Sequence, residues 1–207
     1  MTLLSLATLL TGCTPHPLDS GKAGAGDTAG DSGGDSGADS GGLDASTVYY
    51  FGTSDGQTPD GSYDAPPLEL LFIRTVDPAA SLITEQFWQE PTRGTAWSTG
   101  LIVNAVDATA LTFGSTWDTG DGEIEIVGTF TEGDPWAWTA WHSTSTYLGG
   151  RYQGTTVTSD DQLDGAGADT ADKHVYDEHG TETYQIIEII TPTEQSAFEA
   201  RLAEIGG

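Results

Sequence analysis

A period-two alternation of side chains, interrupted by turn sequences, dominates the chain after residue 46. In the clearest stretch, Ile124, Ile126, Gly128 and Phe130 fall on one face of an extended strand and the residues between them fall on the other. Pairs such as Asp-Pro, Gly-Gly and His-Gly separate such stretches and favour chain reversal. The pattern predicts an all-β domain over residues 47–207. The expected strands span 47–51, 68–76, 82–89, 98–106, 110–117, 123–130, 136–147, 151–159, 173–177 and 183–190.

The short connections between these strands predict an antiparallel meander of about nine to ten strands. Closing the meander into a barrel removes its exposed strand edges, and a β-sandwich is the alternative. A meander barrel of this length with a trailing helix is similar in architecture to the calycin group, which includes the lipocalins and their bacterial relatives. This resemblance covers residues 47–207 and implies an interior that can hold a small apolar molecule.

One helix is expected, at residues 192–205. Thr191 and Glu194 have the spacing of a capping box, and Pro192 suits the first helical position. An apolar stripe follows at helical spacing, with Phe198, Leu202 and Ile205. The stripe predicts that the helix packs against the sheet or closes one end of a barrel.

The chain is strongly acidic, with 32 acidic and 6 basic residues and a formal net charge of −26. Nucleic acid is excluded as a partner because phosphate binding needs a basic patch. The acidity favours solubility, or life in high salt, and could also attract cations. The single cysteine rules out a disulfide within the chain, so the domain depends on its core.

The amino terminus has the pattern of a secretory signal, because residues 3–10 form a short leucine-rich run that small residues follow. Leu10-Thr11-Gly12-Cys13 resembles the lipobox of bacterial lipoproteins. The resemblance implies a signal peptide over residues 1–12 that is cleaved before Cys13, and diacylglyceryl and fatty-acyl (palmitate-type) modification of Cys13. It also implies an extracytoplasmic, membrane-anchored protein, and Thr14, in place of Asp, favours the outer over the inner membrane.

Residues 14–46 are of low complexity, rich in Gly, Ser and Asp, with six Asp and one Lys. Such a segment buries too little apolar surface to offset its ordering entropy. Residues 13–46 are therefore expected to be the lipidated cysteine followed by a disordered, self-repelling tether between the membrane and the β domain.

Two short motifs resemble catalytic signatures. Gly52, Ser54 and Gly56 fit G-x-S-x-G, but a nucleophile elbow needs a helix directly after the serine, and a loop is expected here. Asp118-Thr119-Gly120 resembles the triplet of aspartic proteases, which need a second carboxylate sharing the proton. A hairpin turn is the simpler interpretation. No catalytic residue is assigned, and an enzyme is the least favoured hypothesis.

An aromatic cluster near the middle of the chain is the best candidate for a ligand contact. Alternation places Trp136, Trp138 and His142 on one face of a strand and Trp141 on the other. With Phe130, the inward residues could line an apolar cavity, and His142 could contact the ligand or ligate haem. An exposed Trp141 could stack on a sugar ring. Core packing is the alternative for these side chains.

Five aspartates are expected in one loop, and several carboxylates on a flexible loop suit Ca²⁺. They are Asp160, Asp161, Asp164, Asp169 and Asp172. A solvated acidic loop without a cation is the alternative, and no other cofactor is expected.

Three functions are compatible with the sequence. The first is a non-catalytic surface-interaction or structural module, monomeric, with a filled core and a partner that is a protein, a glycan or a small molecule. The second is a lipocalin-like carrier with a dry cavity lined by Trp136, Trp138 and Phe130. The third is an enzyme. A measured internal cavity separates the first two.

Overall fold

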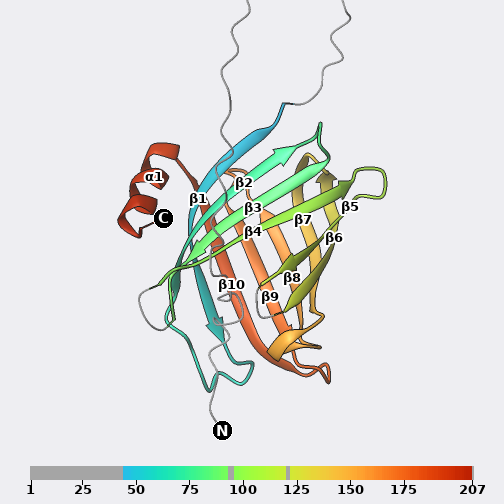
Figure 1. Cartoon of the computed structure of the whole chain (residues 1–207), viewed down its shortest axis with the longest axis vertical. Coiled ribbons are helices and arrows are strands. Elements are labelled where there is room, and N and C mark those ends of the chain that lie inside the picture. Colours follow the sequence, from blue (N-terminus) through green and yellow to red (C-terminus); the bar gives the residue numbers. More distant parts are fainter. Residues whose placement is uncertain (1–43, 93–95, 120–121, 207) are drawn as a thin grey trace, which may run out of the picture.

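The computed structural model describes residues 44–92, 96–119 and 122–206. Ten strands follow one another along the chain, and one α-helix comes after the last strand (Figure 1). The expected all-β domain with a C-terminal helix is confirmed. The elements are β1 (Ser46–Gln57), β2 (Leu68–Asp77), β3 (Leu82–Gln89), β4 (Ser98–Asp107), β5 (Thr112–Asp118), β6 (Glu123–Asp134), β7 (Ala137–Tyr147), the 3₁₀ turn η2 (Gly150–Tyr152), β8 (Thr156–Leu163), β9 (Asp169–Tyr176), β10 (Glu182–Thr193) and α1 (Gln195–Glu204).

The ten strands form one closed antiparallel barrel, so the barrel prediction is confirmed over the sandwich. Every strand lies beside its neighbours in sequence, and the first and last strands pair to close the sheet. This closing ladder runs from Tyr49 opposite Thr193 to Gln57 opposite Gln185. Closure leaves the backbone groups of β1 and β10 paired on both sides, which removes the edges that an open sheet exposes.

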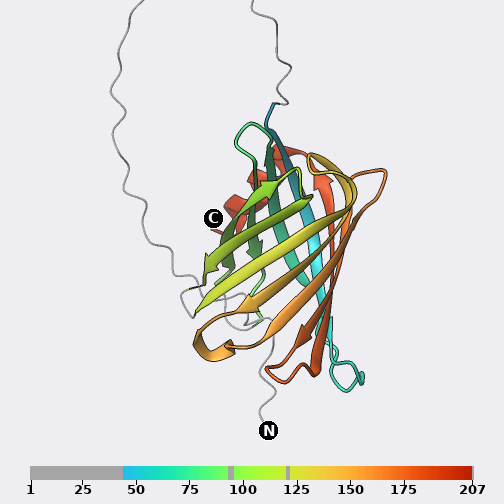
Figure 2. The ribbon, with the colours of Figure 1, turned by 90° about the vertical axis from the view of Figure 1, so that its right-hand side faces the viewer.

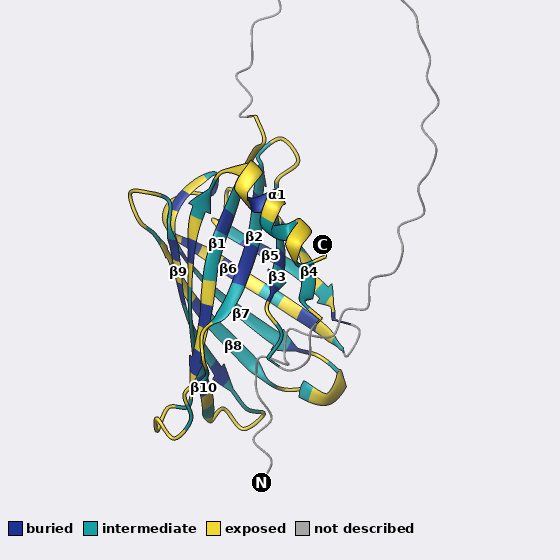
Figure 3. Ribbon diagram, turned by 90° about the vertical axis from the view of Figure 1, so that its left-hand side faces the viewer, coloured by how far each residue is buried: buried dark blue, intermediate teal, exposed yellow. Residues whose placement is uncertain are grey.

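The barrel has two ends, and the strands run obliquely between them (Figure 2). The end where β1 and β7 begin and β10 finishes is called the upper end here, and the end where β2, β4 and β6 begin is called the lower end. Inward and outward side chains alternate along the strands, as Figure 3 shows by burial. The predicted face of β6 is inward, since Ile124 and Phe130 are each 3% exposed whereas Val127 between them is 54% exposed.

A dense group of aromatic side chains fills the upper end. Phe113, Phe130, Trp138 and Trp141 contact one another, with ring centroids 5.1–6.3 Å apart. Gly128 makes room for them, because a Cβ there would lie 2.0 Å from the ring of Phe113. Close-packed rings of this kind leave no space for a ligand.

The helix α1 lies on the outside of the barrel, against β1 and β3 (Figures 1 and 2). Phe198 is 1% exposed and contacts the outward rings of Tyr49, Phe51 and Trp88. Arg201 adds two hydrogen bonds to the carboxylate of Glu69 on β2. The helix therefore packs against the sheet, as expected from its apolar stripe, and does not close an end of the barrel.

The predicted start of this helix is wrong. Residues Thr191, Pro192 and Thr193 continue β10 and lie opposite β1, and the helix begins at Gln195. Glu194 is the N-cap residue and makes no side-chain capping bond. Pairing with β1 completes the barrel, and this gain outweighs a local capping preference worth about 1 kcal/mol. In the described ranges no helix has the length and apolar character needed to cross a membrane.

Candidate functional site

A cavity of about 210 Å³ occupies the barrel interior below the aromatic rings of the upper end. It is partly open to solvent, and its lining reaches Ala65 and Pro66 in the connection between β1 and β2 at the lower end. Small inward residues on three neighbouring strands leave this space unfilled. They include Ser143 and Ser145 on β7, Ser159 on β8 and Ala171 on β9.

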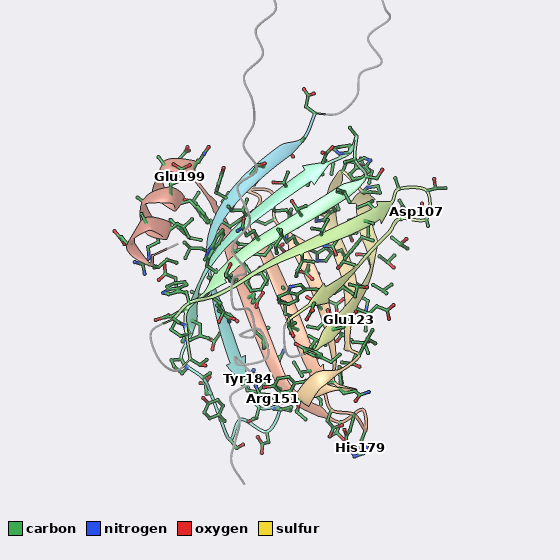
Figure 4. The ribbon with its side chains drawn as sticks, viewed as in Figure 1. Asp107, Glu123, Arg151, His179, Tyr184 and Glu199 are labelled. Atoms are coloured by element: carbon green, nitrogen blue, oxygen red, sulfur yellow. The ribbon has the colours of Figure 1, made fainter. Side chains whose placement is uncertain are left out.

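Apolar and aromatic side chains form the remaining wall of the cavity near its lower end. Phe87 and Trp117 meet edge to face with centroids 5.7 Å apart. Tyr184, labelled near the lower end in Figure 4, fits because Gly56 on the neighbouring strand β1 has no side chain and leaves room for its ring. Burial raises the pKa of Tyr184 to about 12, so its hydroxyl stays protonated at neutral pH.

A buried arginine stands at the centre of the barrel. Arg74 is 4% exposed; its Nε donates to Glu85 Oε1 at 3.0 Å and its Nη2 donates to Asp169 Oδ2 at 2.8 Å. Its guanidinium also lies over the ring of Trp141, 4.8 Å from the centroid. Burial lowers the pKa of Arg74, but the charges of Glu85 and Asp169 outweigh burial and leave it raised. Arg74 therefore remains a cation held between two carboxylates.

A second buried cation lies on the adjacent wall, formed by β9 and β10. Lys173 pairs with Glu188, which also accepts a hydrogen bond from Ser54 at 3.3 Å. Burial lowers the pKa of Lys173, but the charges of Glu188, Asp161 and Glu85 and the hydrogen bond to Glu188 together outweigh burial and leave it raised, so the amine stays charged. The Lys173 side chain is 25% accessible and lines the cavity, so the accessible part faces the interior space.

A further carboxylate in the cavity wall has no cation bonded to it among the described residues. Asp161 is 7% exposed and accepts a hydrogen bond from Ser159 at 2.6 Å. Burial raises the pKa of Asp161 to about 7, and the negative charge of Asp169 adds to this effect. Asp161 is therefore poised to change its protonation state near neutral pH.

Several polar atoms of the cavity lining make no hydrogen bond within the described part of the protein. They are Nη1 of Arg74, Oε1 of Gln89, Oδ1 of Asn104 and Oδ1 of Asp169. Buried polar groups in folded proteins are normally paired, and an unpaired one costs about 1–3 kcal/mol. These atoms lie buried beside the cavity and leave unsatisfied hydrogen-bonding capacity in its wall.

The sequence-predicted aromatic site lies mostly above this cavity. Phe130 and Trp138 are buried in the filled upper end, and Trp136 packs against the same group, so the expectation that they line a dry cavity is wrong. Trp141 does line the cavity. The expectation that Trp141 faces outward is also wrong, since it stacks on Trp138 with centroids 5.2 Å apart.

A bulge explains this error. The register between β6 and β7 shifts on both sides of Glu132, which interrupts strict alternation before Trp141. The same shift turns His142 outward, where its side chain is 45% accessible and its Nδ1 lies 2.8 Å from Asp160. The expectation that His142 faces a ligand or haem inside the barrel is therefore wrong.

The five aspartates expected in one loop are divided between the two surfaces of the barrel. Strands β8 and β9 extend through most of the segment, because only residues 164–168 separate them. Asp161 and Asp169 face the interior, Asp160 and Asp172 bond outward-facing partners, and Asp164 caps the turn. In the residues that the structure describes, no group of three or more His, Cys, Asp or Glu is placed to hold a metal ion.

The two catalytic-looking motifs have structural roles. Ser54 lies inside β1 rather than in a loop after a strand, and its hydroxyl donates to Glu188. Thr119 belongs to the hairpin turn between β5 and β6, where its amide and hydroxyl both bond the carbonyl of Gly122. Cys13, the lipobox and residues 14–43 of the tether lie outside the described residues.

The comparisons with known proteins give no family. No family model and no curated protein matches the chain. Solved structures similar to it include a putative thioesterase II from Thermobifida fusca YX, with 11% identity over 71% of this chain and 79% of that chain and a TM-score of 0.24. An acyl-CoA thioesterase II, TesB2, from Mycobacterium marinum has 12% identity over 72% and 82%, with a TM-score of 0.22. An N-terminal dehydratase from the difficidin assembly line has 7% identity over 75% and 82%, with a TM-score of 0.22. At such scores these likenesses support neither a shared fold nor a shared activity.

Proposed function

We propose that this barrel binds a small amphipathic molecule in its interior cavity. The observation that carries the proposal is a cavity of about 210 Å³ whose lining includes buried polar atoms without protein partners. An interaction module with a filled core predicts no such space. An apolar cavity of about 150 Å³ is enough to hold benzene, so the space here suits a ligand of on the order of ten non-hydrogen atoms.

The apolar and the charged parts of the cavity lining have different roles in binding. Phe87, Trp117 and Val175 supply apolar surface for the body of the ligand. The charged groups around Arg74 and Lys173 lie deeper and are already held by hydrogen bonds to neighbouring carboxylates. A polar end that reaches them meets groups that are already oriented, which reduces the entropy cost of binding.

The barrel is proposed to act at a membrane surface, tethered through a lipid on Cys13. The support is the lipobox-like sequence that ends at Cys13 and the Gly-, Ser- and Asp-rich residues 14–46 after it. Thr14 favours the outer membrane. Mass spectrometry of the membrane fraction should find an acylated amino terminus at Cys13. A Cys13→Ala variant should lose the acyl groups, and membrane partitioning equal to that of the unchanged chain would contradict the anchor.

Ligand binding can be tested with phenethyl alcohol, a neutral amphipathic probe of suitable size. Calorimetric titration should detect saturable binding to the purified protein. Ala171→Leu fills the cavity from β9 and should abolish it, whereas Thr170→Leu, on the exposed face of the same strand, should not. Ser145→Leu provides a second cavity-filling variant from β7, in case Ala171→Leu does not fold. Equal binding by filled and unfilled barrels would place the probe elsewhere and contradict the proposal.

A further inference from the structure

The charges that line the cavity do not balance. Six charged side chains face it: the cations Arg74 and Lys173, and four carboxylates, Glu85, Asp161, Asp169 and Glu188. Arg74 forms ion pairs with both Glu85 and Asp169, and Lys173 forms an ion pair with Glu188. The interior therefore has more negative than positive groups even when one carboxylate is protonated. Unpaired charge in a buried site is costly, which favours an occupant of the opposite sign.

Two of these carboxylates are neighbours on adjacent strands. Asp161 lies opposite Ala171, and Leu163 lies opposite Asp169, so Asp161 and Asp169 are diagonal partners on the inner face. Diagonal neighbours in an antiparallel pair are about 7–8 Å apart, close enough for a single ligand group to lie between them. They are 7% and 2% exposed, and both line the cavity.

Among the fully inaccessible polar atoms of the lining, those without a hydrogen bond are mostly acceptors. Asp169 accepts a hydrogen bond from Arg74 through Oδ2, while its Oδ1 accepts none. Asn104 donates through Nδ2 to Glu85 at 3.4 Å, and its Oδ1 is unpaired. Gln89 Oε1 is a third unpaired acceptor, and Nη1 of Arg74 is the unpaired donor among these fully inaccessible atoms of the described lining. A ligand that donates hydrogen bonds satisfies this set better than one that accepts them.

We infer that the cavity selects ligands carrying a protonated amine, or another cationic hydrogen-bond donor, and that this group is held between Asp161 and Asp169. The inference rests on the proposed function, since it specifies the ligand class of the same site. The apolar part of the ligand lies toward Phe87 and Trp117 at the lower end. Charge-assisted hydrogen bonds to two buried carboxylates supply both affinity and selectivity.

The selectivity depends on pH through Asp161. Its carboxylate is ionised above about pH 7 and neutral below it. The hydroxyl of Ser159 on β8 donates to this carboxylate, and the charges of Asp169 and Lys173 on β9 and of Arg74 on β2 act on it. Glu85 on β3 and Glu188 on β10 line the same cavity. Affinity for an amine is therefore expected to rise with pH through this range, and affinity for a neutral analogue is not.

Three probes that share a phenylethyl group and differ in the polar group test the inference: phenethylamine, phenethyl alcohol and hydrocinnamate. At about pH 8, calorimetry should show the amine binding at least about tenfold tighter than the alcohol, and the carboxylate weakest. Asp161→Asn should remove most of the amine's advantage and leave the alcohol within about twofold of its original affinity. Asp160→Asn, on the outer face of the same strand, is the matched control and should change neither.

The outcomes separate the two proposals. Binding of the alcohol as tight as that of the amine overturns the inference and leaves the proposed function standing. Tighter binding of hydrocinnamate overturns it as well and assigns recognition to Arg74 and Lys173. Failure of all three probes contradicts the proposed function itself. If Asp161→Asn does not fold, the unchanged protein decides, because an amine advantage that is equal at about pH 6 and about pH 8 excludes Asp161 as the selecting group.

Discussion

The two ends of the barrel interior are built on the same strands and yet differ in what they hold. On β7, Trp138 and Trp141 close the upper end, and Ser143 and Ser145, a few residues further along, leave the cavity open. On β9, Asp169 lies highest and Ala171 and Val175 line the space below it. The same backbone architecture therefore accommodates both a filled and an open interior. The size of the inward side chains decides where a ligand can fit.

This division has an energetic meaning. Filled aromatic packing contributes stability through apolar burial of about 25 cal/mol per Å². The lower end gives up part of that burial and instead holds charges that need one another to stay buried. Stability is expected to depend on the upper end and the charged centre, and recognition on the lower end.

The largest effect is expected at the charged centre, between the two ends. Arg74→Met removes the cation from Glu85 and Asp169 and leaves two buried carboxylates unpaired. Breaking a buried ion pair costs about 3–5 kcal/mol, and the presence of two carboxylates places this variant at the top of that range. Urea denaturation followed by circular dichroism measures the loss. A loss below about 1 kcal/mol in the free energy of unfolding would mean that Glu85 and Asp169 are well solvated, as groups exposed to the cavity would be.

Replacing one tryptophan by alanine at each end compares how much the two ends contribute to stability. Trp138→Ala should destabilise the protein by about 4 kcal/mol, because the ring is 6% exposed and surrounded by other rings. Trp117→Ala should cost about half as much, since one side of that ring already faces the cavity. The same denaturation experiment measures both. Equal losses at the two positions would contradict the distinction between a filled and an open end.

Asp161→Asn should change the pH dependence of stability. With a pKa of about 7 in the folded state and about 3.9 unfolded, the native protein holds a proton that the unfolded chain releases between these values. Stability contributed by the protonated form is present below about pH 4 and is lost as pH rises to about 7. The asparagine variant lacks this loss. From about pH 4 to about pH 8 its stability should therefore rise by about 4 kcal/mol relative to that of the unchanged protein.

Thermal or urea unfolding at several pH values measures this effect. Asp160→Asn, on the outer face, provides the baseline and should shift stability by no more than about 0.5 kcal/mol at any pH. Parallel pH profiles for Asp161→Asn and the unchanged protein would show that Asp161 titrates as an ordinary surface carboxylate.

The smallest effect is expected outside the barrel. Arg201→Ala removes two hydrogen bonds to Glu69 that link α1 to β2, but the Arg201 side chain is 35% accessible. A loss of at most about 1 kcal/mol in the free energy of unfolding is expected. Binding of phenethyl alcohol should be unchanged, and weakened binding would show that α1 influences the cavity through the barrel wall.

The fold was largely predictable because its signal is local. Alternation in β6 and the turn sequences between strands identify the meander, and closure follows from the cost of exposed edges. The start of α1 was mispredicted because a local capping signal competed with pairing between β1 and β10, which are far apart in sequence. The bulge beside Glu132 inverted the face assigned to Trp141 and His142. The signal that the sequence offered for this bulge was the glycine at position 133, which adopts a φ of 85° in the structure.

The site was less predictable, because its partners meet only in the closed barrel. Arg74 and Asp169 are 95 residues apart, and Ser54 and Glu188 are 134 apart. Arg74 could have been noticed as a cation on the same face as Leu70 and Phe72 in a largely apolar strand, which marks a paired interior charge. Its two carboxylate partners could not be chosen among 32 acidic residues without the register of the strands.

The pairing of β1 with β10 also makes closure of the barrel depend on contacts between the two ends of the domain. The closing ladder joins the first strand to the last, so most of the domain must be available before the sheet can shut. Such long-range pairing carries a loop-closure entropy cost and slows folding. Until β10 docks, both strand edges are exposed and Lys173 lacks Glu188. The barrel, and the cavity inside it, therefore cannot close before β10 is available to pair with β1.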